Sequence, residues 1–221
     1  MFVSLEGIDG SGKTSVLAAL KRRHRDWFFT AEPCKAVPTG RLLCSMLAGK
    51  QALVPAALPH LFQAARIEHQ ELLLQGLAKA GTTKEATTLV TDRWSLSTLV
   101  YQQDVWSVDQ ICTGLIHAPG IWVPDLTIWI DIDPAEAHAR TTGRGEAVTL
   151  ERLTELRNRY QRAYGRCTAC VFASYGTRLQ ISDVPKTVAA LTDLVDDAIQ
   201  RYIAPAPIAT PASPGELGGG C

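Results

Sequence analysis

The sequence lacks an excess of charge of either sign, because Lys and Arg together number 22 and Asp and Glu together also number 22. Such a balance provides no general field that attracts nucleic acid, so we expect a small-molecule partner whose charge is met by local groups. The apolar runs are too short to cross a membrane, and Glu6 and Asp9 interrupt the opening run, where a signal peptide would need continuity. We therefore expect a cytoplasmic protein that does not enter a membrane.

The sequence also lacks the cysteine pairs of a zinc site and the asparagine motif of a guanine-nucleotide-binding protein. The six cysteines are scattered, and Cys167-Thr-Ala-Cys170 has no second pair at metal-binding spacing. Reduced thiols are therefore expected rather than disulfides or a zinc site. The single asparagine, Asn158, is followed by Arg159, which excludes the guanine-reading N-K-x-D motif. The glycines also lack the G-x-G-x-x-G spacing of dinucleotide-binding loops.

The sequence does contain a G-x-x-x-x-G-K-[ST] motif from Gly7 to Thr14. The motif follows a strand-like apolar run and precedes a helical pattern, which is the context that a phosphate-binding loop requires. Glycines let backbone N–H groups surround a polyphosphate, and the following helix presents the positive end of its dipole. The residues expected to bind phosphate are Gly7, Ile8, Asp9, Gly10, Ser11, Gly12, Lys13, Thr14 and Ser15. Within them, Lys13 is expected to reach the β- and γ-phosphates and the hydroxyl of Thr14 to ligate Mg²⁺.

Hydrophobic periodicity predicts five strands that alternate with helices, which indicates a three-layer α/β fold with a parallel sheet flanked by helices. We expect strands at 1–6, 27–30, 87–91, 125–132 and 178–182, and helices at 13–24, 40–49, 55–80, 95–103, 105–118, from 134, 149–164 and 185–202. A chain of 221 residues with 46% hydrophobic content suits one domain, which we place at 1–203. Residues 204–221, rich in Pro, Ala and Gly, are expected to form a flexible tail.

Two further segments carry groups that suit chemistry at the phosphate site. Phe62 is either a core residue or a platform for stacking, and Arg66 follows it on the same side of a helix, where a guanidinium needs a buried acceptor. Asp92 and Arg93 end a β-branched run that should pair with the first strand, so both side chains are expected to face the phosphate loop rather than to form a surface ion pair.

The segment at about 140–150 is basic and contains glycine, with Arg140 and Arg144 as its candidate functional residues. It is either a plain loop or a mobile lid, because arginine-bearing segments of this kind close over phosphates in phosphoryl-transfer enzymes. The helix that follows alternates Arg with Glu, so much of it is expected to be a solvated face.

Five motifs in order resemble the thymidylate kinase family, a group with a P-loop nucleoside monophosphate kinase-like fold. They are Glu6 to Thr14; Thr30-Ala-Glu-Pro33; Leu61-Phe-Gln-Ala-Ala-Arg66; Asp92-Arg-Trp94 with Ser97, Thr98, Tyr101 and Gln102; and Pro124 to Pro134. The resemblance runs from about Phe2 to Ile203. It implies transfer of a phosphoryl group from ATP to dTMP with Mg²⁺, and a homodimer.

The resemblance also assigns roles to individual residues. Phe62 would stack on thymine, Arg66 would bind its carbonyl, and Tyr101 would lie beneath the deoxyribose. Asp9 would hold the sugar or the acceptor phosphate, Arg93 would bind that phosphate, and Asp92 would help to hold Mg²⁺ through water. The implied dTMP-binding set is Asp9, Glu32, Phe62, Arg66, Arg93, Ser97, Thr98, Tyr101 and Gln102, and the implied catalytic set is Lys13, Arg93, Arg144, Asp92 and Asp9.

The sequence departs from the family pattern at Ala31, where the T-R-E-P segment has arginine. That loss leaves room for a non-catalytic nucleotide-binding module. A deoxynucleoside kinase is the other alternative, because Glu32 can serve as the base that such an enzyme needs. A kinase for a different deoxynucleoside monophosphate also remains open.

Overall fold

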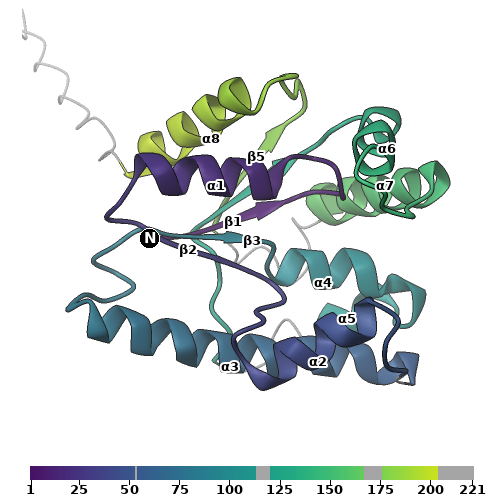
Figure 1. The fold of residues 1–221 in the computed structure, drawn as a ribbon, viewed down its shortest axis with the longest axis horizontal. Helices are drawn as coiled ribbons and strands as arrows, with labels where there is room; N and C mark the ends of the chain where they lie inside the picture. Colours follow the sequence, from purple (N-terminus) through teal and green to yellow (C-terminus); the bar gives the residue numbers. More distant parts are fainter. Residues whose placement is uncertain (53, 113–119, 167–175, 204–221) are drawn as a thin grey trace, which may run out of the picture.

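The structure is a computed structural model that describes residues 1–52, 54–112, 120–166 and 176–203. Within these residues a sheet of five parallel strands has the order β2-β3-β1-β4-β5. The strands are β1 (Phe2–Glu6), β2 (Phe28–Ala31), β3 (Leu89–Asp92), β4 (Leu126–Ile130) and β5 (Thr177–Ile181). The α-helices are α1 (Lys13–Arg23), α2 (Pro38–Leu47), α3 (Leu58–Lys79), α4 (Ser95–Tyr101), α5 (Val108–Ile111), α6 (Pro134–Thr142), α7 (Leu150–Arg166) and α8 (Val188–Ile203). Helices therefore lie on both faces of the sheet, as Figure 1 shows.

The three central strands are buried at every residue, because helices cover both of their faces. Side chains alternate along β1, so Val3 and Leu5 pack with Val16 and Leu20 of α1 and with Val195 of α8. Phe2 faces the opposite side, against Leu89 and Trp94. Glu6 shares the parity of Phe2, and so this carboxylate enters the layer formed by α3, α4 and α7.

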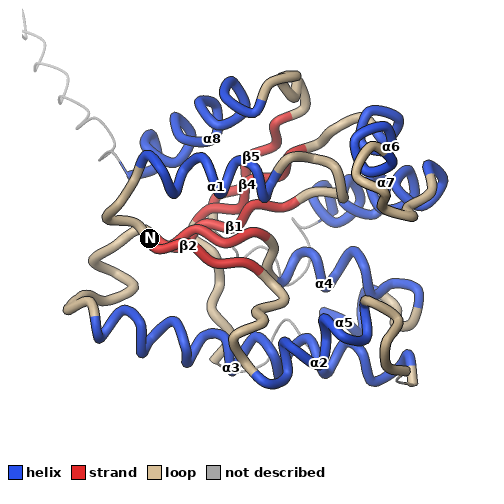
Figure 2. The backbone as a smooth tube through the Cα atoms, viewed as in Figure 1, coloured by secondary structure: helices blue, strands red, loops and turns tan. Residues whose placement is uncertain are grey.

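Helices α3, α4 and α7 lie on the side of the sheet opposite to α1 and α8 (Figure 2). The apolar stripe of α7, Leu153, Leu156 and Tyr160, packs with Leu99 of α4 and Trp129 of β4. Helix α7 therefore rests on the sheet through this stripe, while positions such as Glu151 and Thr154 are exposed to solvent.

The register of the sheet places the functional loops at one edge. Leu5 of β1 pairs with Asp92 of β3, so the phosphate loop and Arg93 leave adjacent strands at their carboxyl ends. The prediction that the Asp-Arg strand lies beside the first strand is confirmed.

The predicted order of strands and helices is confirmed, and the strand bounds differ by at most two residues at each end. The helix predicted at 105–118 is wrong at its start. Gln102–Asp104 form a 3-10 turn, and Ser107 caps α5 by accepting the N–H of Gln110 at 3.2 Å. Pro55–Ala57 likewise form a 3-10 turn before α3. The predictions for His117, for Cys167 and Cys170 and for the tail at 204–221 lie outside the described residues. Among the described helices none has the length and apolar character to cross a membrane.

Candidate active site

The loop between β1 and α1 has the backbone that its motif predicts. Gly7 and Gly10 have φ angles of 145° and 83°, which favour glycine. A Cβ on Gly10 would lie 2.6 Å from the carbonyl oxygen of Ala137, so the loop passes α6 too closely for a side chain. Gly12 immediately precedes α1, whose free N–H groups and dipole make a site for an anion.

Lys13 is 4% exposed, and its ammonium group folds back onto this loop. Nζ donates to the carbonyl oxygens of Gly7 and Ile8, each at 2.9 Å, and to Ser11 Oγ at 3.1 Å. Burial lowers the pKa of Lys13 to about 8, and the charge of Arg93 acts in the same direction. Because an ammonium group has three donors, a phosphate oxygen must replace one of these acceptors to be bound by Lys13.

Thr14 and Asp92 meet beside Lys13 and form a pair that fits Mg²⁺. Thr14 Oγ1 donates to Asp92 Oδ2 at 2.6 Å, while the buried Oδ1 of Asp92 has no hydrogen-bond partner among the described residues. Mg²⁺ prefers oxygen ligands such as the Thr14 hydroxyl and the Asp92 carboxylate, whose Oδ1 is unsatisfied. Water and phosphate oxygens would complete its coordination shell. Among the described residues no cluster of three or more His, Cys, Asp or Glu forms an all-protein metal site.

Arg93 is held at the carboxyl end of β3 in an unusual backbone conformation. Its φ of 70° is uncommon for a residue other than glycine and is typical of constrained functional positions. Nη2 donates to Asp9 Oδ1 at 2.6 Å, and the guanidinium carbon lies 4.9 Å from the centre of the Tyr101 ring. Tyr101 donates to Asp9 Oδ2 at 3.1 Å, so Asp9, Arg93 and Tyr101 form one cluster.

A pocket of about 250 Å³ opens beside this cluster. All nine residues of the implied dTMP-binding set line it, and Pro33, Leu47 and Trp94 complete its wall. The fold brings these residues together at one edge of the sheet. They come from the phosphate loop, the segments after β2 and β3, helices α2, α3 and α4, and the 3-10 turn that follows α4.

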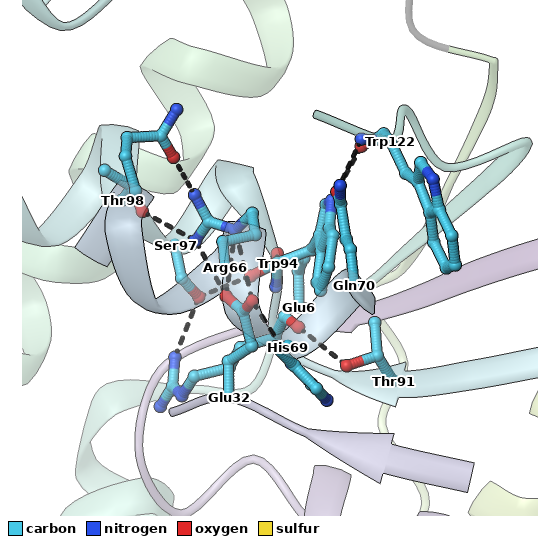
Figure 3. Close-up of polar contacts among 12 residues, drawn as sticks. Glu6, Glu32, Arg66, His69, Gln70, Thr91, Trp94, Ser97, Thr98 and Trp122 are labelled. Atoms are coloured by element: carbon cyan, nitrogen blue, oxygen red, sulfur yellow. Dashed lines mark hydrogen bonds and ion pairs between the residues drawn. The ribbon is translucent and has the colours of Figure 1, made fainter. Parts of the chain in front are cut away.

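The buried acceptor that the sequence predicts for Arg66 is Glu32, as Figure 3 shows. Arg66 is 1% exposed and pairs with Glu32 at an Nη2–Oε2 distance of 2.7 Å. Nη2 also donates to Thr98 Oγ1 at 3.0 Å, and Nη1 donates to Gln63. Arg66 and Glu32 therefore satisfy each other inside the pocket wall, and Phe62 is half-buried in the same wall.

The two arginines of the predicted lid have different surroundings. Arg140, in the last turn of α6, donates through Nη1 to the carbonyl oxygen of Gly10 at 3.2 Å and pairs with Glu136. Arg144 lies in the turn between α6 and α7 and pairs with Glu146 at 2.7 Å, with 53% of its side chain exposed. The structure thus brings Arg140 to the phosphate loop and leaves Arg144 in solvent.

Sequence reasoning missed several buried polar groups behind the pocket. Glu6 and Tyr160 contact the cluster around Arg93, and His69 donates to or accepts from Thr30 Oγ1 at 2.6 Å behind Glu32. A carboxylate in a fully buried strand is a signal that could have identified Glu6. The sequence predicts that much of α7 is a solvated face, but Arg159 on this helix is 5% exposed and pairs with Asp104 and Glu155.

A parallel sheet with a phosphate loop after β1, a paired hydroxyl and carboxylate and an adjoining polar pocket defines a P-loop nucleotide kinase. A family model described as thymidylate kinase matches residues 5–184. A probable thymidylate kinase of Pyrobaculum aerophilum is 33% identical over 156 residues, which cover 71% of this chain and 77% of that protein. A probable thymidylate kinase of Pyrobaculum calidifontis is 29% identical over 202 residues, covering 91% and 100%, and the thymidylate kinase of Bdellovibrio bacteriovorus is 31% identical over 160 residues, covering 68% and 71%. The chain belongs to the thymidylate kinase family.

Proposed function

We propose that this protein transfers the γ-phosphoryl group of ATP to the phosphate of dTMP, giving dTDP and ADP. The observation that carries the proposal is the pocket beside the phosphate loop, whose wall contains every residue expected to contact dTMP. Its base end combines Phe62 with Arg66, Thr98 and Gln102, which suits a flat ring with polar edges. Tyr101 donates to Asp9 of the phosphate loop, and the deoxyribose would lie beside this pair.

The protein's contribution to phosphoryl transfer is positioning and charge neutralisation, because the transition state is loose and little covalent chemistry is required. Lys13 would hold the β- and γ-phosphates of ATP, Arg93 would hold the acceptor phosphate, and a lid arginine would approach the transferred group. Holding both nucleotides in line can account for about 7–11 kcal/mol of the barrier. Mg²⁺, held by Thr14 and through water by Asp92, would neutralise charge on the phosphate oxygens.

The environment of Glu32 favours a monophosphate acceptor over a nucleoside. A nucleoside kinase needs a carboxylate free to accept the proton of a 5′-hydroxyl. Glu32 is 7% exposed and bound by Arg66 through Nε and Nη2, so its charge is already neutralised by that guanidinium. A positioning role for Glu32, with Arg66 as the group that reads the base, fits these contacts better.

We also propose that the protein acts in the cytoplasm as a homodimer. Cys34 and Cys44 are free cysteines, which suits a reducing compartment. Helix α3 exposes Ile67, Leu72 and Leu74, and these apolar side chains are candidates for the subunit interface.

The proposal is tested by measuring ADP release with Mg·ATP across dTMP, dUMP, dCMP, dGMP, dAMP, UMP and thymidine. We expect dTMP to be preferred over both UMP and thymidine, and the Lys13→Ala variant to lose turnover. Preference for thymidine would indicate a nucleoside kinase, and preference for another monophosphate would change the acceptor. If no compound in the panel causes ADP release, the result would support a nucleotide-binding module without catalytic activity.

A further inference from the structure

A group of buried polar side chains contacts Arg93, and Figure 3 shows two of its members, Glu6 and Ser97. Glu6, at the end of β1, is fully buried and accepts three hydrogen bonds. Its Oε1 accepts from the backbone N–H of Trp94 at 2.8 Å, and its Oε2 accepts from Ser97 Oγ at 2.6 Å and from Tyr160 OH at 3.0 Å. Trp94 follows β3, Ser97 belongs to α4 and Tyr160 belongs to α7. One carboxylate therefore connects three elements.

Both hydroxyls that bind Glu6 also contact the guanidinium of Arg93. Nη1 donates to Ser97 Oγ at 3.2 Å and, more weakly, to Tyr160 OH at 3.5 Å, in addition to the carbonyl oxygen of Gly7 at 3.0 Å. A hydroxyl has one proton and two lone pairs. When Ser97 and Tyr160 give their protons to the carboxylate, their lone pairs are turned towards Arg93.

Glu6 acts on the backbone as well as on the guanidinium. The N–H that it accepts belongs to the peptide directly after Arg93, whose φ of 70° needs support from its surroundings. Burial raises the pKa of Glu6, while the donors and the charge of Arg93 act in the opposite direction. Burial also holds the pKa of Tyr160 well above its usual range, so the phenol remains a donor.

We propose that Glu6 and Tyr160 are positioning residues that fix Arg93 for the acceptor phosphate, with Ser97 between them. The inference rests on the proposed function, in which Arg93 binds the phosphate of dTMP. It assigns to Tyr160 a link between α7, the helix that follows the lid, and the acceptor site. Neither Glu6 nor Tyr160 lines the pocket, so both act through Arg93.

The test uses Tyr160→Phe, which removes one hydroxyl and keeps the ring that stacks on Trp129. Tyr164→Phe is the matched control: it lies one helical turn further on, also packs on Trp129, and its buried hydroxyl has no partner among the described residues. The readout is the Kd for dTMP and for thymidine, which lacks the phosphate. We expect Tyr160→Phe to weaken dTMP binding by about tenfold and to lower kcat/KM by up to about a hundredfold, with thymidine binding changed less than about twofold. Tyr164→Phe should match the wild type in every assay.

A double-mutant cycle separates positioning from a structural role. If Tyr160 acts through Arg93, then Tyr160→Phe adds nothing to the loss of dTMP affinity in the Arg93→Ala variant. Additive effects, or equal weakening of dTMP and thymidine binding, would overturn the inference. Glu6→Gln is a second variant with the same expected pattern. A wild-type protein without dTMP turnover refutes the proposed function, whereas normal turnover with an unaffected Tyr160→Phe variant refutes this inference alone.

Discussion

The lowered pKa of Lys13 makes the binding of ATP sensitive to pH. Below a pKa of about 8 the ammonium is charged and attracts phosphate, and above it a growing fraction is neutral. We expect the Kd for ATP to be nearly constant from about pH 7 to 8 and then to rise by up to about tenfold per pH unit. Titrations of ATP up to about pH 9.5 measure this change. Lys13→Arg is the control, because arginine remains charged throughout, and parallel profiles for the two proteins would contradict the prediction.

For individual residues, the sequence predicts roles within a local motif. It does not predict which residues far apart in the chain contact one another. Spacing alone identifies Gly7 to Thr14, and the apolar side of α3 identifies Arg66 as a residue in need of an acceptor. The identity of that acceptor, Glu32, depends on where β2 lies in the sheet. Glu6 and Tyr160 are separated by 154 positions, and no local sequence pattern predicts the hydrogen bond between their side chains.

The position of α6 determines which arginine approaches the transferred phosphate. Asp133 caps the helix by accepting the N–H of Ala135 at 2.8 Å, and Arg140 in its last turn already contacts the phosphate loop. Arg144 lies beyond the helix end with 53% of its side chain exposed, and in the proposed lid it would approach the nucleotide on closure. We expect Arg140→Ala to raise the KM for ATP, and Arg144→Ala to lower kcat by about a thousandfold or more with little change in that KM.

Steady-state kinetics of the two variants, with Arg152→Ala as the control, measure this division of roles. Arg152 lies on α7 and pairs with Asp104 and Glu155, away from the phosphate loop. A loss of kcat in Arg140→Ala, with Arg144→Ala unaffected, would assign the catalytic arginine to α6. The resemblance to the family favours Arg144 over Arg140, and these kinetics test that choice.

Helix α3 connects the pocket to the surface of the molecule, because it buries several polar residues and exposes several apolar ones. Its buried positions include Gln63, Arg66 and Gln70, while Ile67 and Leu74 are 52% and 45% exposed. A helix in a monomer normally buries its apolar side. This arrangement is explained if the buried polar residues serve the proposed dTMP pocket and a second copy of the chain covers Ile67 and Leu74.

The proposed homodimer therefore has a consequence for substrate binding. Ile67→Glu places a charge in the proposed interface, so we expect the variant to elute as a monomer and to bind dTMP at least about tenfold more weakly, because α3 carries Phe62 and Arg66. The affinity for ATP should change little, since the phosphate loop belongs to β1 and α1. Val108→Glu, at another exposed apolar position, is the control and should retain both the dimer and dTMP binding. A wild-type protein that sediments as a monomer would refute the homodimer, and a dimeric Ile67→Glu variant would place the interface elsewhere. Either outcome would leave the exposed face of α3 without a partner from this chain.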